Sequence, residues 1–161
     1  MKIVTLASAS PRRRDLLAML LKDFEVSPSN VSEKRFQGEE PLKYVARMAN
    51  EKAEACSTRS DIILGADTIA VKDGEIFQKP SSKKDAMRML NKLIGKIHHV
   101  ITSVAVRAGD SYDQITVVTE VEFANLSLQQ IESYLGTDEP WDSAGAYSIQ
   151  GLAGSFVKRI N

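Results

Sequence analysis

Apolar residues recur along this chain at strand-like and helix-like spacings in turn. Short apolar, β-branched runs and alternating stretches predict strands over 2–7, 61–71, 75–78, 99–107 and 114–123. Asp73-Gly74 and Gly109-Asp110 carry the turn chemistry of hairpins, so the last two stretches are expected to pair antiparallel.

Four segments carry helical spacing and helix end signals. The first begins at Pro11, with Ser10 as a candidate N-cap and leucines at 16, 17, 20 and 21. The others are predicted over 41–57, 82–95 and 127–136, the last two with capping-box patterns. In the second helix Lys52 falls near the apolar face. Strands and helices alternate with hairpins mixed in, so the predicted fold class is α/β or mixed α+β with a mixed sheet.

Composition narrows the class of protein. The chain has 161 residues, 43% of them apolar, which is long enough for a core without disulfides or structural metal. One cysteine and two histidines exclude an intrachain disulfide and a Cys/His zinc cluster, and favour a reducing compartment. No apolar run approaches the ~18 residues of a membrane span, so we expect a cytoplasmic protein with no membrane partner.

Charge is balanced overall but unevenly distributed. Residues 1–107 hold 19 Lys and Arg against 13 Asp and Glu, whereas residues 108–157 hold 8 acids and no Lys or Arg. A nucleic-acid binder usually carries a basic excess over the whole domain, so the asymmetry favours a small anionic ligand over a polynucleotide. Chance clustering of charges on solvated faces remains the alternative.

A run of hydroxyls and arginines opens the first helix: Ser8-Ala9-Ser10-Pro11-Arg12-Arg13-Arg14. Cations beside the positive end of a helix dipole are unfavourable by ~0.3–1 kcal/mol each, and an anion would offset that cost. Ser8, Ser10, free backbone N–H groups and guanidinium forks together suit a phosphate chain. A solvated basic turn is the alternative interpretation.

Two further segments carry candidate chemistry. Asp67 follows Gly65 and Ala66 at the end of an apolar strand, where a carboxylate can serve as metal ligand or general base, or simply cap the strand. Gln150 lies in a Gly/Ala/Ser-rich segment and carries the donor and acceptor needed to read a base edge, or to bond locally.

Several chemistries are excluded. The chain has no Gly-x-Ser-x-Gly elbow, no Gly-x-x-x-x-Gly-Lys-Ser/Thr loop and no Gly-x-Gly-x-x-Gly fingerprint. His98 and His99 are adjacent, so on a strand they face opposite sides and are structural or surface groups. What remains is chemistry by carboxylates, cationic side chains and a hard divalent cation, which suits phosphoryl or nucleotidyl transfer.

Together these segments resemble the Maf family of nucleoside triphosphate pyrophosphatases, in order and over essentially the whole chain. The matching pieces are Ser8 to Arg13, Glu33, Lys52, Gly65 to Thr68, Lys79-Pro80, the stretch 95–104, and Glu139-Pro140 through to Gln150-Gly151. The resemblance implies a central mixed twisted sheet flanked by helices, with two lobes and a cleft, similar to inosine triphosphate pyrophosphatases.

The resemblance also implies roles for individual residues. The family hydrolyses nucleoside triphosphates to monophosphate and pyrophosphate with a divalent cation, Mg²⁺ or Mn²⁺. Asp67 matches the family's general base, and Glu33 an acidic position associated with catalysis or metal. Residues matching the triphosphate site are Ser8, Arg12, Arg13, Lys52 and Lys79, and the two lysines are expected to act in catalysis as well.

The segment Gly65-Ala66-Asp67-Thr68 resembles that of the family branch that prefers dTTP and UTP. A related branch has Gly-Ser-Asp-Gln at the same position. In the branch that prefers dTTP and UTP, Arg12, Thr68 and Gln150 match positions that set base preference. A nucleotide-binding regulator that inhibits septum formation without turnover is the alternative, and a homodimer is compatible with either function.

One departure concerns the C-terminus. Family members usually continue past the last apolar strand with a further segment and a closing helix, whereas this sequence stops at Asn161. We therefore expect a single Maf-like domain over 1–161 whose C-terminal helix is missing.

Overall fold

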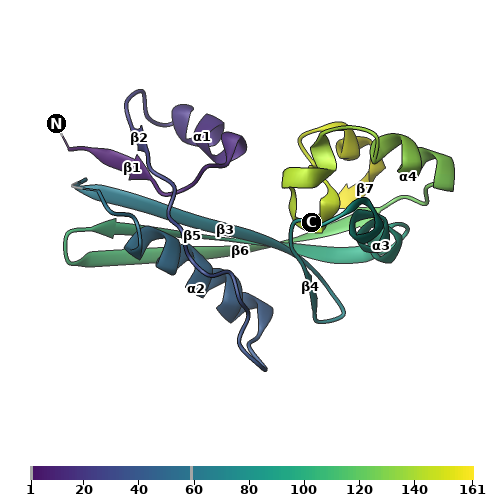
Figure 1. Cartoon of the computed structure of the whole chain (residues 1–161), viewed down its shortest axis with the longest axis horizontal. Helices are drawn as coiled ribbons and strands as arrows, with labels where there is room; N and C mark the ends of the chain where they lie inside the picture. The colour runs from purple at the N-terminus through teal and green to yellow at the C-terminus, as the bar shows by residue number, and fades with distance from the viewer. Residues whose placement is uncertain (1, 59) are drawn as a thin grey trace. The chain divides into compact units, whose positions relative to one another are not determined.

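The computed structural model describes residues 2–58 and 60–161, and its strands and helices alternate along most of the chain (Figure 1). In order they are β1 (Val4–Leu6), α1 (Pro11–Ala18), β2 (Glu25–Val26), α2 (Pro41–Glu54), β3 (Ile62–Lys72), β4 (Glu75–Phe77), α3 (Lys83–Leu93), β5 (Ile97–Ala108), β6 (Ser111–Phe123), α4 (Leu128–Tyr134) and β7 (Val157–Ile160). Three short 3₁₀ helices, Glu139–Asp142, Ala144–Ala146 and Leu152–Phe156, lie between α4 and β7.

The strands form one sheet of mixed direction. Its order is β2-β1-β3-β5-β6-β7, with β4 paired to β3. β1 runs parallel to both β2 and β3, whereas β4 runs antiparallel to β3 and β7 antiparallel to β6. The mixed α/β class predicted from the sequence is therefore confirmed. No helix in the described residues combines the length and the apolar character that crossing a membrane requires.

The chain divides into two compact units. The first holds residues up to Asp67 together with Thr102–Val117, and the second holds Thr68–Ile101 and Val118–Asn161. β3, β5 and β6 each contribute one part to each unit, because the boundaries fall inside these long strands. The two lobes and the cleft implied by the resemblance stay a prediction.

The core of the first unit lies beneath α2. Tyr44, Val45 and Met48 of this helix are fully buried. Ala49 and Ala53 pack with Ala105 of β5 and with Ile63 of β3. Small side chains at this contact bring the helix close to the strands, which matters for the site described below.

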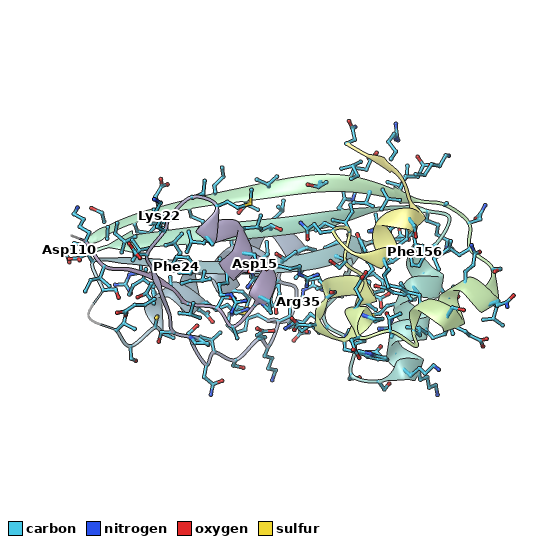
Figure 2. The ribbon with its side chains drawn as sticks, turned by 90° about the horizontal axis from the view of Figure 1, so that it is seen from above. Asp15, Lys22, Phe24, Arg35, Asp110 and Phe156 are labelled. Carbon is cyan, nitrogen blue, oxygen red and sulfur yellow. The ribbon has the colours of Figure 1, made fainter. Side chains whose placement is uncertain are left out.

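The core of the second unit is aromatic. Phe123 meets Tyr147 edge to face at 4.7 Å between ring centroids, and Phe156, which is labelled in Figure 2, at 6.2 Å. Leu90 and Leu93 of α3 are fully buried in the same cluster. Edge-to-face pairs of this kind add to the hydrophobic stabilisation from burial alone.

Most predicted helix ends are close to the observed ones. Ser82 accepts a hydrogen bond from the Asp85 N–H at 3.1 Å, and Ser127 forms the expected capping box with Gln130. α2 ends at Glu54 rather than at Ser57. Beyond the helix end, the Cys56 thiol donates a hydrogen bond to the Ser27 carbonyl at 3.3 Å.

α1 differs most from the prediction. Ser10 occupies the N-cap position, but its side chain accepts no capping bond, and its own N–H donates to Ser8 Oγ at 3.2 Å. The helix ends at Ala18, so Leu20 lies in the following turn and is exposed, as is Leu16. Of the apolar residues in α1, Leu17 alone is buried, and the helical spacing of leucines 16, 17, 20 and 21 does not continue the helix beyond Ala18.

His98 and His99 face opposite sides of β5, as predicted: His98 is 1% exposed and His99 is exposed. His98 Nε2 lies 2.7 Å from the Tyr147 hydroxyl, and the imidazole packs edge to face on Phe123. Burial lowers the pKa of His98 to about 4, because the charged imidazolium is poorly solvated in this core.

This pKa shift predicts acid sensitivity. Above about pH 6.5 both folded and unfolded chains carry neutral His98, so its contribution to stability is constant; below that pH the unfolded chain takes up the proton first. We expect about 2 kcal/mol of stability to be lost on this account between neutrality and about pH 5. Urea denaturation of wild type and His98→Gln at the two pH values checks it, with His99→Gln as control. An equal acid loss in wild type and His98→Gln would contradict the assignment.

Candidate active site

The start of α1 brings together a hydroxyl and an arginine. Ser8 is buried, and its Oγ accepts hydrogen bonds from Arg13 Nη1 and from the Ser10 N–H, both at 3.2 Å. Arg12 and Arg13 are half-buried in the first turn, which contains no acidic residue. Positive charge is therefore concentrated where the helix dipole is also positive, an arrangement suited to an anion.

Gly65 sets the distance between α2 and β3. A Cβ at this position would lie 2.2 Å from the Ala49 carbonyl oxygen and 2.6 Å from the Ala53 nitrogen, so the helix backbone packs directly on the strand. Asp67 is two residues further along β3 and points to the same face. Lys52 precedes Ala53 on the helix, so this contact brings its side chain within reach of Asp67.

Lys52 joins two carboxylates. Its Nζ lies 2.7 Å from Asp67 Oδ1 and 2.7 Å from Glu33 Oε1. The Lys52 and Asp67 side chains are only 12% and 10% exposed, whereas Glu33 is 52% exposed. The structure thus places three of the predicted catalytic residues, from a loop, α2 and β3, in one cluster.

The Asp67 carboxylate is subject to opposing effects. Burial raises its pKa, and the negative charge of Glu33 adds to the rise; Lys52, by charge and hydrogen bond, and Arg13, by charge, act to lower it. Burial prevails, so the pKa is above its ordinary value. A carboxylate shifted in this direction is a better proton acceptor than one in water.

The same carboxylates fit a divalent cation. The described part of the chain holds no cluster of three or more His, Cys, Asp or Glu side chains that could form a protein-only cage. Mg²⁺, however, is commonly bound by one or two carboxylates together with water and substrate phosphates. Glu33 and Asp67 already converge on a positive charge, the Lys52 ammonium, so the donor set suits such an ion.

The remaining predicted residues belong to the second unit. Lys79 pairs with Asp142, a contact between residues far apart in sequence that sequence analysis missed. Thr68 is half-buried on β3, and Gln150 is exposed in the turn before the third 3₁₀ helix. No feature of the sequence signals Asp142 as the partner of Lys79.

Glu139 holds the segment that carries Gln150. Its carboxylate accepts hydrogen bonds from the N–H groups of Leu152 at 2.6 Å and Ala153 at 3.0 Å, and from the Tyr134 hydroxyl at 3.0 Å. A Cβ at Gly151 would lie 2.1 Å from this carboxylate, so glycine is needed for the close approach. Sequence analysis included Glu139 in a motif but gave it no role.

Comparison with known proteins identifies the family of this chain. The family model described as "Maf-like protein" matches residues 3–161. The chain belongs to the Maf-like protein family. Two relatives named dTTP/UTP pyrophosphatase, from Vibrio cholerae and Photorhabdus laumondii, are 47% and 44% identical to this Maf-like chain. The aligned regions cover 98% and 100% of the chain, and 86% and 84% of those proteins.

A third relative of the same name, from Escherichia coli K12, is 45% identical over 97% of the chain and 81% of its own length. Among solved structures, Ham1 proteins from Staphylococcus aureus and Coxiella burnetii each align with a TM-score of 0.53 at 14% identity. They cover 77% and 78% of this chain, and 73% and 75% of their own chains. At this identity the likeness shows a shared fold only.

The Gly65 contact gives a direct prediction. Gly65→Ala adds a methyl group with no room, and we expect a loss of about 1–3 kcal/mol of stability, as overpacked cores show. Urea denaturation measures it. Gly136→Ala is the control, since its Cβ would meet nothing closer than 3.3 Å. Equal stability of the two variants would show that α2 does not rest on Gly65.

Proposed function

We propose that this protein hydrolyses dTTP and UTP to the monophosphate and pyrophosphate. The observation that carries the proposal is the cluster of Lys52 with the carboxylates of Glu33 and Asp67 in a Maf-like chain. The relatives named dTTP/UTP pyrophosphatase, at 44–47% identity, support the same reaction and the same bases.

In the proposed reaction water attacks the α-phosphorus, the α–β anhydride bond breaks, and pyrophosphate leaves with the bonding electron pair. Asp67 orients the water and accepts its proton, the role of a carboxylate general base. A divalent cation held by Glu33 and Asp67 would neutralise charge that develops on the phosphoryl oxygens. Lys52 keeps the two carboxylates together and adds positive charge beside them.

Binding of the triphosphate is assigned to the basic residues. Ser8, Ser10, Arg12 and Arg13 at the start of α1 offer hydroxyl, backbone N–H and guanidinium donors to phosphate oxygens. Lys79 is proposed to contact the same triphosphate, and a phosphate group would then replace Asp142 as the partner of Lys79.

Base preference is assigned to three polar side chains. Thr68 and Gln150 offer donors and acceptors for a pyrimidine edge, and Arg12 is included with them because it matches a base-selecting position in the family. The homodimer, the cytoplasmic location and the preference for Mg²⁺ or Mn²⁺ stay predictions.

A nucleotide panel tests the reaction. With Mg²⁺ or Mn²⁺ present, we expect dTTP and UTP to release pyrophosphate faster than purine nucleotides, over many turnovers. Product analysis by anion-exchange chromatography distinguishes pyrophosphate from orthophosphate. Release of orthophosphate alone, or a folded protein that turns over nothing, would contradict the proposal.

The role of Asp67 is tested separately. Asp67→Asn keeps the size of the side chain but removes the proton acceptor, so kcat should fall by about 10²–10⁴-fold. Nucleotide affinity, measured by calorimetry, should change far less, because the basic residues remain. Asp110→Asn, at the exposed tip of the β5–β6 hairpin (Figure 2), is the matched control. Unchanged turnover in Asp67→Asn would reject Asp67 as the base.

A further inference from the structure

The loop that carries Glu33 is held on α2 by side chains outside the proposed catalytic set. The Glu33 carboxylate is half exposed, and the loop leading from it to α2, residues 33–40, contains no regular helix or strand. A loop of this kind needs specific contacts to keep a side chain in place. The structure provides them from one face of the helix.

Arg47 makes most of these contacts. Its Nε and Nη2 donate to the two carboxylate oxygens of Glu39, both at 2.7 Å, and Nη2 also donates to the Lys34 carbonyl at 3.1 Å. Nη1 donates to Glu51 at 3.0 Å, and the guanidinium lies 4.0 Å from the centre of the Phe36 ring. These bonds engage four of the five N–H donors of the side chain, which is only 20% exposed.

Further hydrogen bonds, within the loop and from Tyr44, hold the loop in place beside Arg47. Glu39 accepts a hydrogen bond from the Phe36 N–H at 3.0 Å through its carboxylate, and one from Arg35 Nε at 2.7 Å through its backbone carbonyl. Arg35 is labelled in Figure 2. The buried Tyr44, one turn before Arg47 on α2, donates its hydroxyl proton to the Glu33 carbonyl at 2.9 Å.

We propose that Arg47 is a positioning residue that fixes Glu33 beside Lys52 by binding the Lys34 carbonyl and the Glu39 carboxylate. This inference rests on the proposed function for its effect on turnover. α2 then performs two tasks: it presents Lys52 directly, and through Arg47 it holds the loop that presents Glu33 to the same ammonium.

The chemistry of the side chain favours arginine at this position. A planar guanidinium binds a carboxylate with two parallel bonds and still has donors for a carbonyl and a second acid, whereas an ammonium provides a single compact charge. The Arg47 side chain holds the pKa of Glu39 at about 2, so the pair stays ionised throughout the neutral range. The ion pair between Arg47 and Glu39 is therefore present across the pH range in which such an enzyme would work.

The first test is a double-mutant cycle. Arg47→Met should raise the metal concentration for half-maximal turnover, or lower kcat, by about 10–100-fold, as loss of residues that support metal ligands does. Arg47→Lys should reduce turnover less than Arg47→Met, since lysine keeps the positive charge. If Arg47 acts through Glu33, the double variant Glu33→Gln/Arg47→Met should turn over nucleotide no more slowly than Glu33→Gln alone. Multiplied losses in the double variant would overturn the proposal.

Arg88 provides a matched control. It also lies on a helix, pairs with two acids, Glu75 and Asp85, and lies 5.8 Å from an aromatic ring centre, that of Phe77. It belongs to the other compact unit and has no assigned role in the reaction. Arg88→Met should leave turnover within about twofold of wild type, as expected for an exposed ion pair. An equal loss in Arg88→Met and Arg47→Met would show a general effect of removing an arginine, and would overturn the proposal.

A second readout requires no turnover. In Arg47→Met the Phe36 amide, bonded to Glu39, and its neighbours over 34–39 should exchange hydrogen faster, while the amides of α2 keep their protection. Exchange unchanged over 34–39 would overturn the positioning role. If wild type hydrolyses no nucleotide but this exchange difference is present, the proposed function fails and the positioning of the loop stands.

Discussion

The backbone of α2 lies directly on β3 at Gly65, and the polar cluster of the first unit depends on that contact. The close approach leaves no space for a side chain at position 65. It places Lys52, on the helix, opposite Asp67, on the strand, at hydrogen-bond distance. A side chain at position 65 would push the helix outward and move Lys52 away from this buried carboxylate, and buried charges without a close partner are tolerated poorly.

Cations on α2 divide the nearby acids between them. Arg47 binds Glu39 and Glu51, and Lys52, five residues later, binds Glu33 and Asp67. Arg47 and Lys52 therefore each bind a separate pair of carboxylates. The more flexible ammonium of Lys52 binds the pair that is proposed to act in catalysis. Arginine, which binds carboxylates in a fixed planar geometry, serves the pair with the structural role.

Periodicity and end signals predicted most of this fold, because β3, β5, β6 and the capped helices are long enough to show a pattern. β2 has two exposed residues and the 3₁₀ helices three to five residues each, too few for periodicity to be visible. Candidate site residues came from motifs and family resemblance. The residues that bind these site residues could not be predicted in this way. The contact of Lys79 with Asp142 spans 63 positions, and only the folded chain brings such residues together.

The first turn of α1 has no acidic side chain and no side-chain cap, although three arginines follow Pro11. A helix start of this kind is electrostatically unfavourable by itself. An anion bound there removes part of that cost, and any ligand that binds only the folded chain shifts the folding equilibrium by mass action. A nucleotide would then act on this protein as a folding ligand as well as a substrate, so that the abundance of folded protein rises with the concentration of the nucleotide it consumes.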